Sequence, residues 1–160
     1  MTIEETMQLI DDELFSISKA PPIKRVMLGE ADGNRFEVPA VLIERVGRVR
    51  KTDMQVLQHN KTAWEAEYLM SVFSSSASDY QSVRNSQKIV DRISHRIERE
   101  NHPRRLLDHN AIGVYVHEVK YGTLAISAAT AKTAITIAPV DYIGGTIRIA
   151  VLFVDPDTTD

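Results

Sequence analysis

Cysteine is absent from this chain of 160 residues. Its absence excludes a disulfide framework, a thiolate nucleophile and any zinc or iron-sulfur site built on sulfur ligands. A chain of this length buries enough surface to be stable without such cross-links. We therefore expect a single domain over residues 1–160.

Long apolar runs are also absent, since none approaches the roughly 20 residues that cross a bilayer. The first 13 residues contain five acids and no base, the reverse of the basic start of a signal peptide. We expect a protein that stays in the cytoplasm where it is made and has no membrane partner. The five acids are Glu4, Glu5, Asp11, Asp12 and Glu13.

Motifs for metals, cofactors and nucleophilic catalysis are missing as well. The last four histidines are seven or eight residues apart, too far for ligands on one helix, and Pro103 interrupts the segment between His95 and His109. The glycine pair Gly144-Gly145 lacks the lysine and the following helix of a phosphate-binding loop. Serines 74, 75, 76 and 78 lack a nucleophile elbow and are typical of a turn before a helix. We expect no metal and no cofactor.

Two carboxylates offer the one catalytic alternative. Glu65 and Glu67 are two residues apart on one face of a predicted strand, which brings them to roughly 7 Å, a separation compatible with acid and base roles in a glycosidase. Any exposed strand face gives the same spacing. A small hydrolase that uses this pair is therefore the alternative of a different class, and our main expectation is that the chain is not an enzyme.

Charge is unevenly distributed although the net charge is only -3. Residues 81–105 contain seven bases and three acids, and helical spacing places most of these bases opposite an apolar stripe. Three interpretations stay open: a solvated face, a contact with an acidic protein surface, and a contact with nucleic acid. The predicted basic face is Arg84, Lys88, Arg92, His95 and Arg99, with Arg96 at one margin, and the stripe is Val83, Val90, Ile93 and Ile97.

The acidic termini complement this basic face. Glu4, Glu5, Asp11 and Asp12 lie on the predicted first helix, and the tail at residues 155–160 is acidic again. These acids could meet the basic helix of a neighbouring copy, a head-to-tail contact that closes into a ring when the rotation allows.

Hydrophobic periodicity predicts the remaining elements. Ile3, Met7, Ile10 and Leu14 form one stripe of a first helix of about 13 residues, and the spacing of Thr2 and Glu5 predicts a capping box at its start. A second capping box at Ser78 and Gln81 predicts a central helix that starts near Asp79 and stops before Pro103. The predicted strands are 23–28, 36–46, 64–73, 112–119, 123–126, 134–138 and 147–154.

These elements predict an α+β fold, a mostly antiparallel sheet packed by an N-terminal helix and a central helix. Residues 29–34 form a turn, within either a hairpin or a strand, loop, strand unit. Pro39 lies at an edge or near a strand start, because it cannot donate a hydrogen bond. Residues 47–61 are polar with little periodicity, so we expect an extended loop or arm there.

This order of elements resembles the tail terminator, or tail completion, family of tailed bacteriophages. The resemblance is carried by the strand Ala63-Trp64-Glu65-Ala66-Glu67-Tyr68-Leu69-Met70-Ser71-Val72-Phe73, the helix over 79–100 and the strand over 145–155. It covers most of the chain and is one of pattern and length. The segment at 47–61 and the extra strand over 128–138 depart from a minimal member.

The resemblance implies a structural virion protein without catalysis. It implies a homo-oligomer, a hexameric ring, at the junction of tail and neck, which stops growth of the tail tube and contacts tube and neck proteins. A sheath contact is implied if the tail is contractile, and DNA is met only in passage through the lumen. Another head-tail joining or neck component is the alternative within this class. The interface residues we predict are Arg84, Lys88, Arg92, Arg96 and Arg99 with Glu4, Glu5, Asp11 and Asp12.

Overall fold

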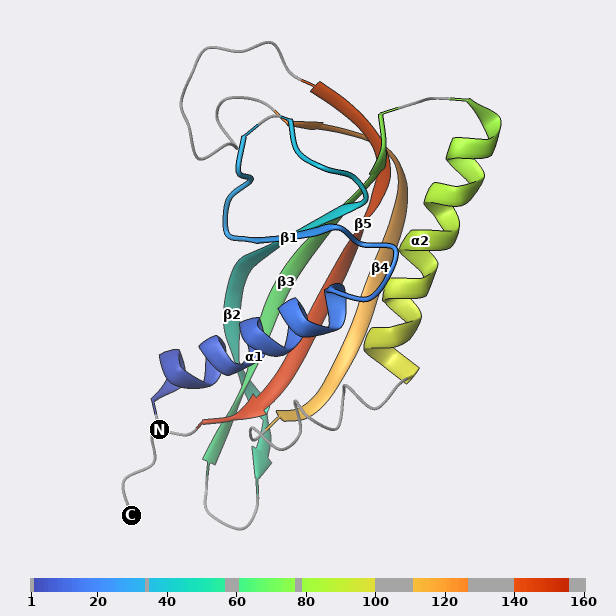
Figure 1. Cartoon of the computed structure of the whole chain (residues 1–160). Helices are drawn as coiled ribbons and strands as arrows, with labels where there is room; N and C mark the ends of the chain where they lie inside the picture. The colour runs from blue at the N-terminus through green and yellow to red at the C-terminus, as the bar shows by residue number, and fades with distance from the viewer. Residues whose placement is uncertain are drawn as a thin grey trace.

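The fold is one five-stranded sheet with two helices, seen in a computed structural model that describes residues 2–33, 35–56, 61–76, 79–99, 111–126 and 140–155 (Figure 1). Strand order across the sheet is β1-β2-β3-β5-β4, and every neighbouring pair is antiparallel except β1 and β2. The α+β prediction is confirmed. The helices are α1 (Ile3–Ser18) and α2 (Tyr80–Arg99), and the strands are β1 (Arg25–Leu28), β2 (Ala40–Val56), β3 (Lys61–Ser75), β4 (Ala111–Ile126) and β5 (Val140–Val154).

Both helices pack on the same face of the sheet and share one hydrophobic core. Successive side chains of a strand point to opposite faces, so alternate residues of β3 and β5 enter this core. The predicted strand over 64–73 is confirmed as part of β3. Core residues of β3 are Ala66, Tyr68, Met70 and Val72, those of β5 are Ile147, Ile149, Val151 and Phe153, and the helices add Met7, Ile10, Leu14, Ile17, Val90, Ile93 and Ile97.

The opposite face of the sheet is divided into an apolar end and a charged end. At the apolar end the segment between β1 and β2 folds over the sheet, and the Phe36 ring stacks on Tyr142 with 5.0 Å between ring centroids. Phe73 meets both rings edge to face. The charged end is open and includes Glu65, Glu67 and Arg148.

Both helices begin with a side-chain cap. The Thr2 hydroxyl accepts from the Glu5 amide at 3.1 Å while the Glu5 carboxylate accepts from the Thr2 amide at 2.7 Å, which confirms the first capping box. For α2 the cap is Asp79, whose carboxylate accepts from the Ser82 amide at 3.0 Å. Gln81 instead donates to Asn85, and Ser78 lies outside the described residues.

The interpretation of residues 47–61 as a loop is wrong over 47–56, because β2 continues to Val56 and pairs with β3 along this length. Two bulges interrupt the register there, which breaks the period of two that would have identified a strand. The Arg48 and Arg50 guanidinium groups lie 4.8 Å and 5.3 Å from the Trp64 ring centroid and form cation-π contacts with it. A polar sequence therefore forms this part of the strand.

Three further boundaries differ from the prediction. β4 runs unbroken through Tyr121-Gly122, where Gly122 takes φ 154° and continues the pairing with Gly144. Gly144-Gly145 lies inside β5 and does not separate strands. β2 starts at Ala40, directly after Pro39, and not at residue 36. β1 pairs with β2 in parallel, so 23–46 is a strand, loop, strand unit, one of the two predicted alternatives, and Pro39 lies near a strand start as predicted. The predicted strand at 134–138, the helix stop at 101–103 and most of the acidic tail lie outside the described residues.

Candidate functional site

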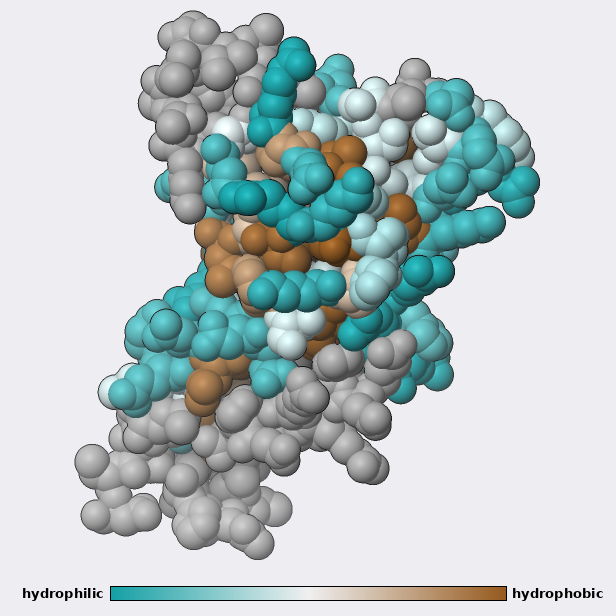
Figure 2. Space-filling model, in the orientation of Figure 1, coloured by the Kyte–Doolittle hydropathy of each residue, from teal (hydrophilic) through white to brown (hydrophobic). Residues whose placement is uncertain are grey.

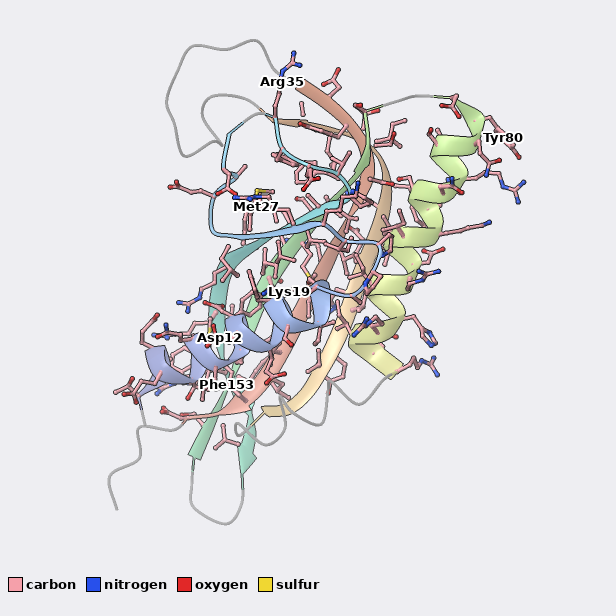
Figure 3. The ribbon with its side chains drawn as sticks, in the orientation of Figure 1. Asp12, Lys19, Met27, Arg35, Tyr80 and Phe153 are labelled. Carbon is pink, nitrogen blue, oxygen red and sulfur yellow. The ribbon has the colours of Figure 1, made fainter. Side chains whose placement is uncertain are left out.

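The most distinctive surface is a stripe of cations along α2, which we call the basic stripe: Arg84, Lys88, Arg92 and Arg99. Val90, Ile93 and Ile97 point into the core, so the spacing of the helix turns all four bases of the stripe to solvent. The 15 steps along the helix from Arg84 to Arg99 correspond to about 22 Å along its axis. Figure 2 shows a mainly hydrophilic surface over α2, and Figure 3 shows side chains with nitrogen tips projecting from its outer side. Arg96, predicted at the margin, is half-buried.

No described carboxylate forms an ion pair with the basic stripe. The Arg84 guanidinium lies 5.7 Å from the ring centroid of Tyr80, which is 74% exposed at the first turn of the helix (Figure 3). Asp91 is the acid at the margin of the stripe, and its carboxylate accepts a hydrogen bond from the hydroxyl of Tyr121 on β4. That bond raises the pKa of Tyr121. The stripe therefore presents positive charge outward.

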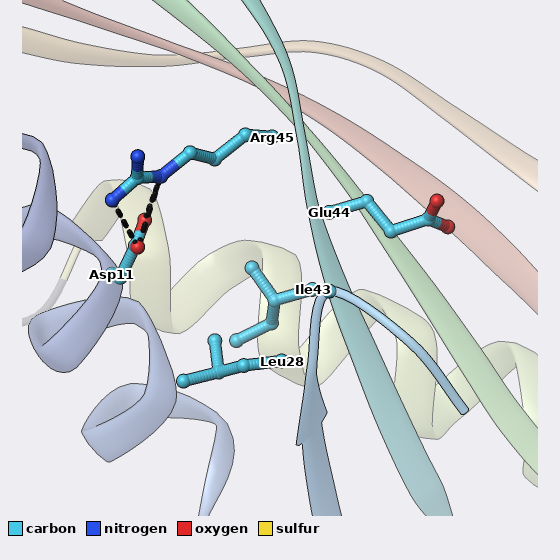
Figure 4. A pocket seen from close by; sticks show the side chains of 6 residues that line it. Asp11, Leu28, Ile43, Glu44 and Arg45 are labelled. Atoms are coloured by element: carbon cyan, nitrogen blue, oxygen red, sulfur yellow. Dashed lines mark hydrogen bonds and ion pairs between the residues drawn. The ribbon is translucent and has the colours of Figure 1, made fainter. Parts of the chain in front are cut away.

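The predicted acids of α1 are engaged within the chain. Arg45 on β2 donates from Nε and Nη2 to Asp11, at 2.9 Å and 2.6 Å to Oδ2, and from Nη1 to Glu4 at 3.0 Å. Figure 4 shows the paired contact with Asp11 beside Leu28 and Ile43. The hydrogen bond to Asp11 raises the pKa of Arg45 further above its ordinary value. We call this three-residue contact the Arg45 clasp.

The clasp fixes α1 to the sheet above Tyr68. The Tyr68 ring is fully buried, its hydroxyl donates to the Met7 carbonyl at 3.5 Å, and burial raises the pKa of that hydroxyl. Sequence reasoning missed Arg45. The one signal was the seven-residue spacing of Glu4 and Asp11, which places both on one face of the helix as partners for a shared cation.

The two other acids of α1 that were predicted at an interface, Glu5 and Asp12, differ from each other. Glu5 is held by the capping box, and Asp12 is exposed on the outer side of the helix (Figure 3) beside Gln8 and Leu9. Glu4 and Asp11 thus share the single positive charge of Arg45, and of the four predicted acids only Asp12 is exposed without a hydrogen bond or ion pair to a described residue. The acidic surface that α1 offers to a neighbouring copy is smaller than its sequence suggests.

Glu65 and Glu67 lie on the open face of β3, as predicted, within a shallow hollow of about 340 Å³. Lys51 Nζ lies 2.8 Å from Glu65, His117 Nε2 lies 3.6 Å from it, and Arg148 lies 3.8 Å from Glu67. The hydrogen bond from Lys51 is the main cause of the lowered pKa of Glu65. A glycosidase acid needs a raised pKa, so this environment favours an ionised, structural carboxylate.

The sheet has two long edges to which no described strand pairs. β1 covers β2 only over Ala40–Ile43, so Glu44–Val56 has an open edge. On the far side β4 pairs with β5 alone. Unpaired edges of this length are templates for another strand. Val46 and Val49, next to the β2 edge, are 52% and 63% exposed.

Comparison with known protein families finds no matching family model, and comparison with curated proteins finds no match. Among the described residues, no group of three or more histidines, aspartates or glutamates could hold a metal ion. Neither of the described helices combines the length and the apolar character needed to cross a membrane.

Proposed function

We propose that this chain is a structural virion protein that forms a ring at the top of a phage tail, ends growth of the tail tube and joins the tail to the neck. The observation that carries the proposal is the pair of open edges, Glu44–Val56 of β2 and Ala111–Ile126 of β4, on opposite sides of one sheet. No described strand pairs with either edge, so a second chain can pair with the backbone groups along both.

The directions of the two edge strands suit a head-to-tail contact. Steps from β2 to β3, β5 and β4 are all antiparallel, so the two edge strands run in opposite directions. When β2 of one copy meets β4 of the next, the new pair is therefore antiparallel, and the sheet continues from copy to copy. A contact between two different surfaces produces a closed ring when the rotation closes.

The apolar side chains near the β2 edge support such a contact. Val46 and Val49 expose more than half of their surface, and β-branched residues in this setting gain free energy when a neighbouring strand covers them. Tyr115 on β4 is 51% exposed and belongs to the edge strand of the opposite side. These residues offer apolar area to a contact whose main component is backbone hydrogen bonding.

Within this function the tail tube and neck proteins are the partners, and the sheath is a further partner if the tail is contractile. The ring is located at the tail-neck junction of the virion, and DNA passes through its lumen. The charged open face of the sheet or the helix face borders that lumen. The function requires no catalysis and no cofactor.

Mass measurement of the purified chain, alone and with tail tubes, tests the proposal. We expect a closed oligomer of the 18.0-kDa chain, six copies in a hexamer, that binds the end of a tube. The double variant Val46→Lys with Val49→Lys should shift the mass to a monomer with an unchanged circular dichroism spectrum, because lysine at an edge opposes strand pairing.

The matched control is Tyr80→Lys, which removes an exposed apolar side chain from α2, away from both edges. This variant should keep the oligomer. A wild-type chain that stays monomeric at all concentrations and fails to bind tubes would refute the ring.

A further inference from the structure

The outer side of α2 is polar as well as basic, and this favours one of the two partners that its charge suits. Tyr80, at the first turn, is the one exposed large apolar side chain among the described residues of this helix. Charged, amide and imidazole side chains occupy its other exposed positions, and Figure 2 shows a mainly hydrophilic surface there. A protein interface buries apolar and aromatic anchors at its centre, whereas an interface with nucleic acid is polar and positively charged. The helix therefore fits nucleic acid better than an acidic protein.

The cations of the basic stripe are not balanced within the described part of the chain. No described carboxylate forms an ion pair with them. The first helix of a second copy offers little acid in return, because Glu4 and Asp11 share Arg45 and the capping box holds Glu5. A polyanion from outside the chain matches the four positive charges of the stripe better than α1 of a neighbour does.

The spacing of the stripe suits a row of phosphates. Arg84, Lys88 and Arg92 follow one another at intervals of about 6 Å along the helix axis, and Arg99 lies about 10 Å further on. The whole length of about 22 Å corresponds to roughly six base pairs at about 3.4 Å per pair. Three of the four are arginines, whose planar guanidinium group binds two phosphate oxygens at once. Asn85, exposed beside Arg84, adds an amide donor of the kind that commonly contacts phosphate.

Two acids limit the contact on one side of the helix. Asp91 and Glu98 are exposed at the margin that faces β4, where Asp91 is bonded to Tyr121 and Glu98 lines a hollow with Val114. These carboxylates repel phosphates. A bound duplex must therefore lie over the outer side of α2, away from the β4 edge, so it does not compete with a strand that pairs with that edge.

We propose that the basic stripe binds the phosphate backbone of double-stranded DNA without reading its bases. The choice of DNA rests on the proposed function, in which DNA passes through the lumen of the ring. The inference goes beyond that passage, because it assigns the residues that contact DNA. Within a ring, the contact places α2 on the lumen side and the open face of the sheet on the outside.

Fluorescence anisotropy of a labelled duplex of about 20 base pairs, titrated with the full chain, tests the inference. Four phosphate contacts predict a slope of about -3.6 for the logarithm of the binding constant against the logarithm of the salt concentration. The affinity should therefore fall by about a hundredfold between about 50 and 200 mM salt. Lys88→Gln with Arg92→Gln should weaken binding by about tenfold or more at low salt and make the slope shallower by about two.

The matched control removes the same charge elsewhere on the surface. Lys24→Gln with Arg35→Gln changes exposed positions in the segments that flank β1, and Figure 3 shows Arg35 away from α2. This variant should change the affinity by no more than about threefold and leave the slope unchanged. Glu98→Gln should strengthen binding by about twofold or more, because it removes a charge that repels phosphate. Misfolding cannot produce such a gain.

Equal losses for the two double variants, a slope near zero, or no binding at low salt overturn the inference. So does a poly-glutamate peptide that binds as tightly as the duplex and loses affinity in the Lys88→Gln, Arg92→Gln variant, because the stripe would then suit an acidic protein. An RNA duplex that binds more than about tenfold tighter overturns the choice of DNA. The mass measurement judges the ring separately. A monomer that binds the duplex through the stripe refutes the ring and keeps this inference, and an oligomer that does not bind DNA does the reverse.

Discussion

Arg45 is the residue that joins α1 to the sheet. Its guanidinium forms a fork with the Asp11 carboxylate and a third contact with Glu4, while its own side chain is 34% exposed. Exposed ion pairs contribute little free energy because water and salt screen them. The Arg45 clasp should contribute more free energy than an ordinary surface ion pair, because two guanidinium nitrogens contact the Asp11 carboxylate and Asp11 is partly buried.

We predict that Arg45→Ala lowers the free energy of unfolding by about 1 kcal/mol, near the upper end for partly exposed pairs. Arg45→Lys should recover less than half of the loss, because an ammonium group cannot form the two-nitrogen fork. Urea unfolding monitored by circular dichroism measures both variants. Arg35→Ala, at an exposed position, is the matched control and should leave the midpoint unchanged.

A double-mutant cycle with Asp11→Ala tests whether the clasp is the cause. The losses of Arg45→Ala and Asp11→Ala should be less than additive, since each single change already removes the shared contact. Full additivity would assign the effect of Arg45 to its packing against the sheet instead of its charge.

At the scale of the strand, Gly144 shows how closely β3 and β5 approach. A Cβ atom at this position would lie 1.7 Å from the carbonyl oxygen of Val72, a backbone atom that cannot move independently. The same pairing places Gly145 opposite Val72 and Gly144 opposite Phe73 in the register of the sheet. The missing side chain at Gly144 therefore permits this close approach of β5 to the backbone of β3.

We predict that Gly144→Ala destabilises the protein by about 2 kcal/mol or more, the scale of overpacking in a dense interior. Gly47→Ala is the matched control, because nothing lies within 4 Å of a Cβ there, and it should be tolerated. Thermal and urea midpoints measure both. A Gly144→Ala protein with a wild-type midpoint would show that β5 can separate from β3 at this point without cost.

Periodicity predicted the elements that bury one continuous face. The stripes of α1 and α2, the alternation of β3 and the covered faces of β5 all follow from apolar residues at regular intervals. The distal half of β2 has no such stripe. Arg48 and Arg50 stand where apolar residues would be expected, and their guanidinium groups lie over the Trp64 ring. A strand of this kind forms because it pairs with a neighbouring strand, and that pairing cannot be read from its own residues.

The candidate site was predictable to a similar extent. Helical spacing alone identifies the basic stripe, since its four bases recur at nearly regular intervals opposite the core. The Arg45 clasp and the bond between Tyr121 and Asp91 join residues 34 and 30 positions apart in the chain. Contacts of that range depend on the packing of whole elements, so charge counts overstated how much acid α1 presents at its surface.

For the whole molecule, charge on the open face of the sheet is balanced by short local pairs. Glu65 with Lys51, Glu67 with Arg148 and Glu118 with Lys120 lie on neighbouring strands or along one strand, so this face is nearly neutral. The stripe on α2 is the exception. Its excess of positive charge lies on the outer side of α2, on the face of the sheet that the helices cover.

The same pairs set the response of the whole molecule to acid. Lys51 lowers the pKa of Glu65 below its ordinary 4.5, and the Ser82 amide and hydroxyl lower the pKa of Asp79 below its ordinary 3.8. A carboxyl with a lowered folded pKa contributes stability that is complete above its unfolded pKa and is lost as the pH falls through the folded pKa. Stability should therefore decline from about pH 4.5 downward.

We predict that Glu65→Gln reduces the slope of that acid decline while leaving stability near neutral pH lower than wild type, because the amide loses the charge that Lys51 pairs with. Urea midpoints between about pH 3 and pH 7 measure the slope, which reports the difference in bound protons between the two states. Glu30→Gln, at an exposed position without an ion pair to a described cation, is the matched control and should keep the wild-type slope. If Glu65→Gln and wild type decline in parallel, the ionised Glu65 pair does not contribute to folding, and the open face holds its charges without gaining stability from them.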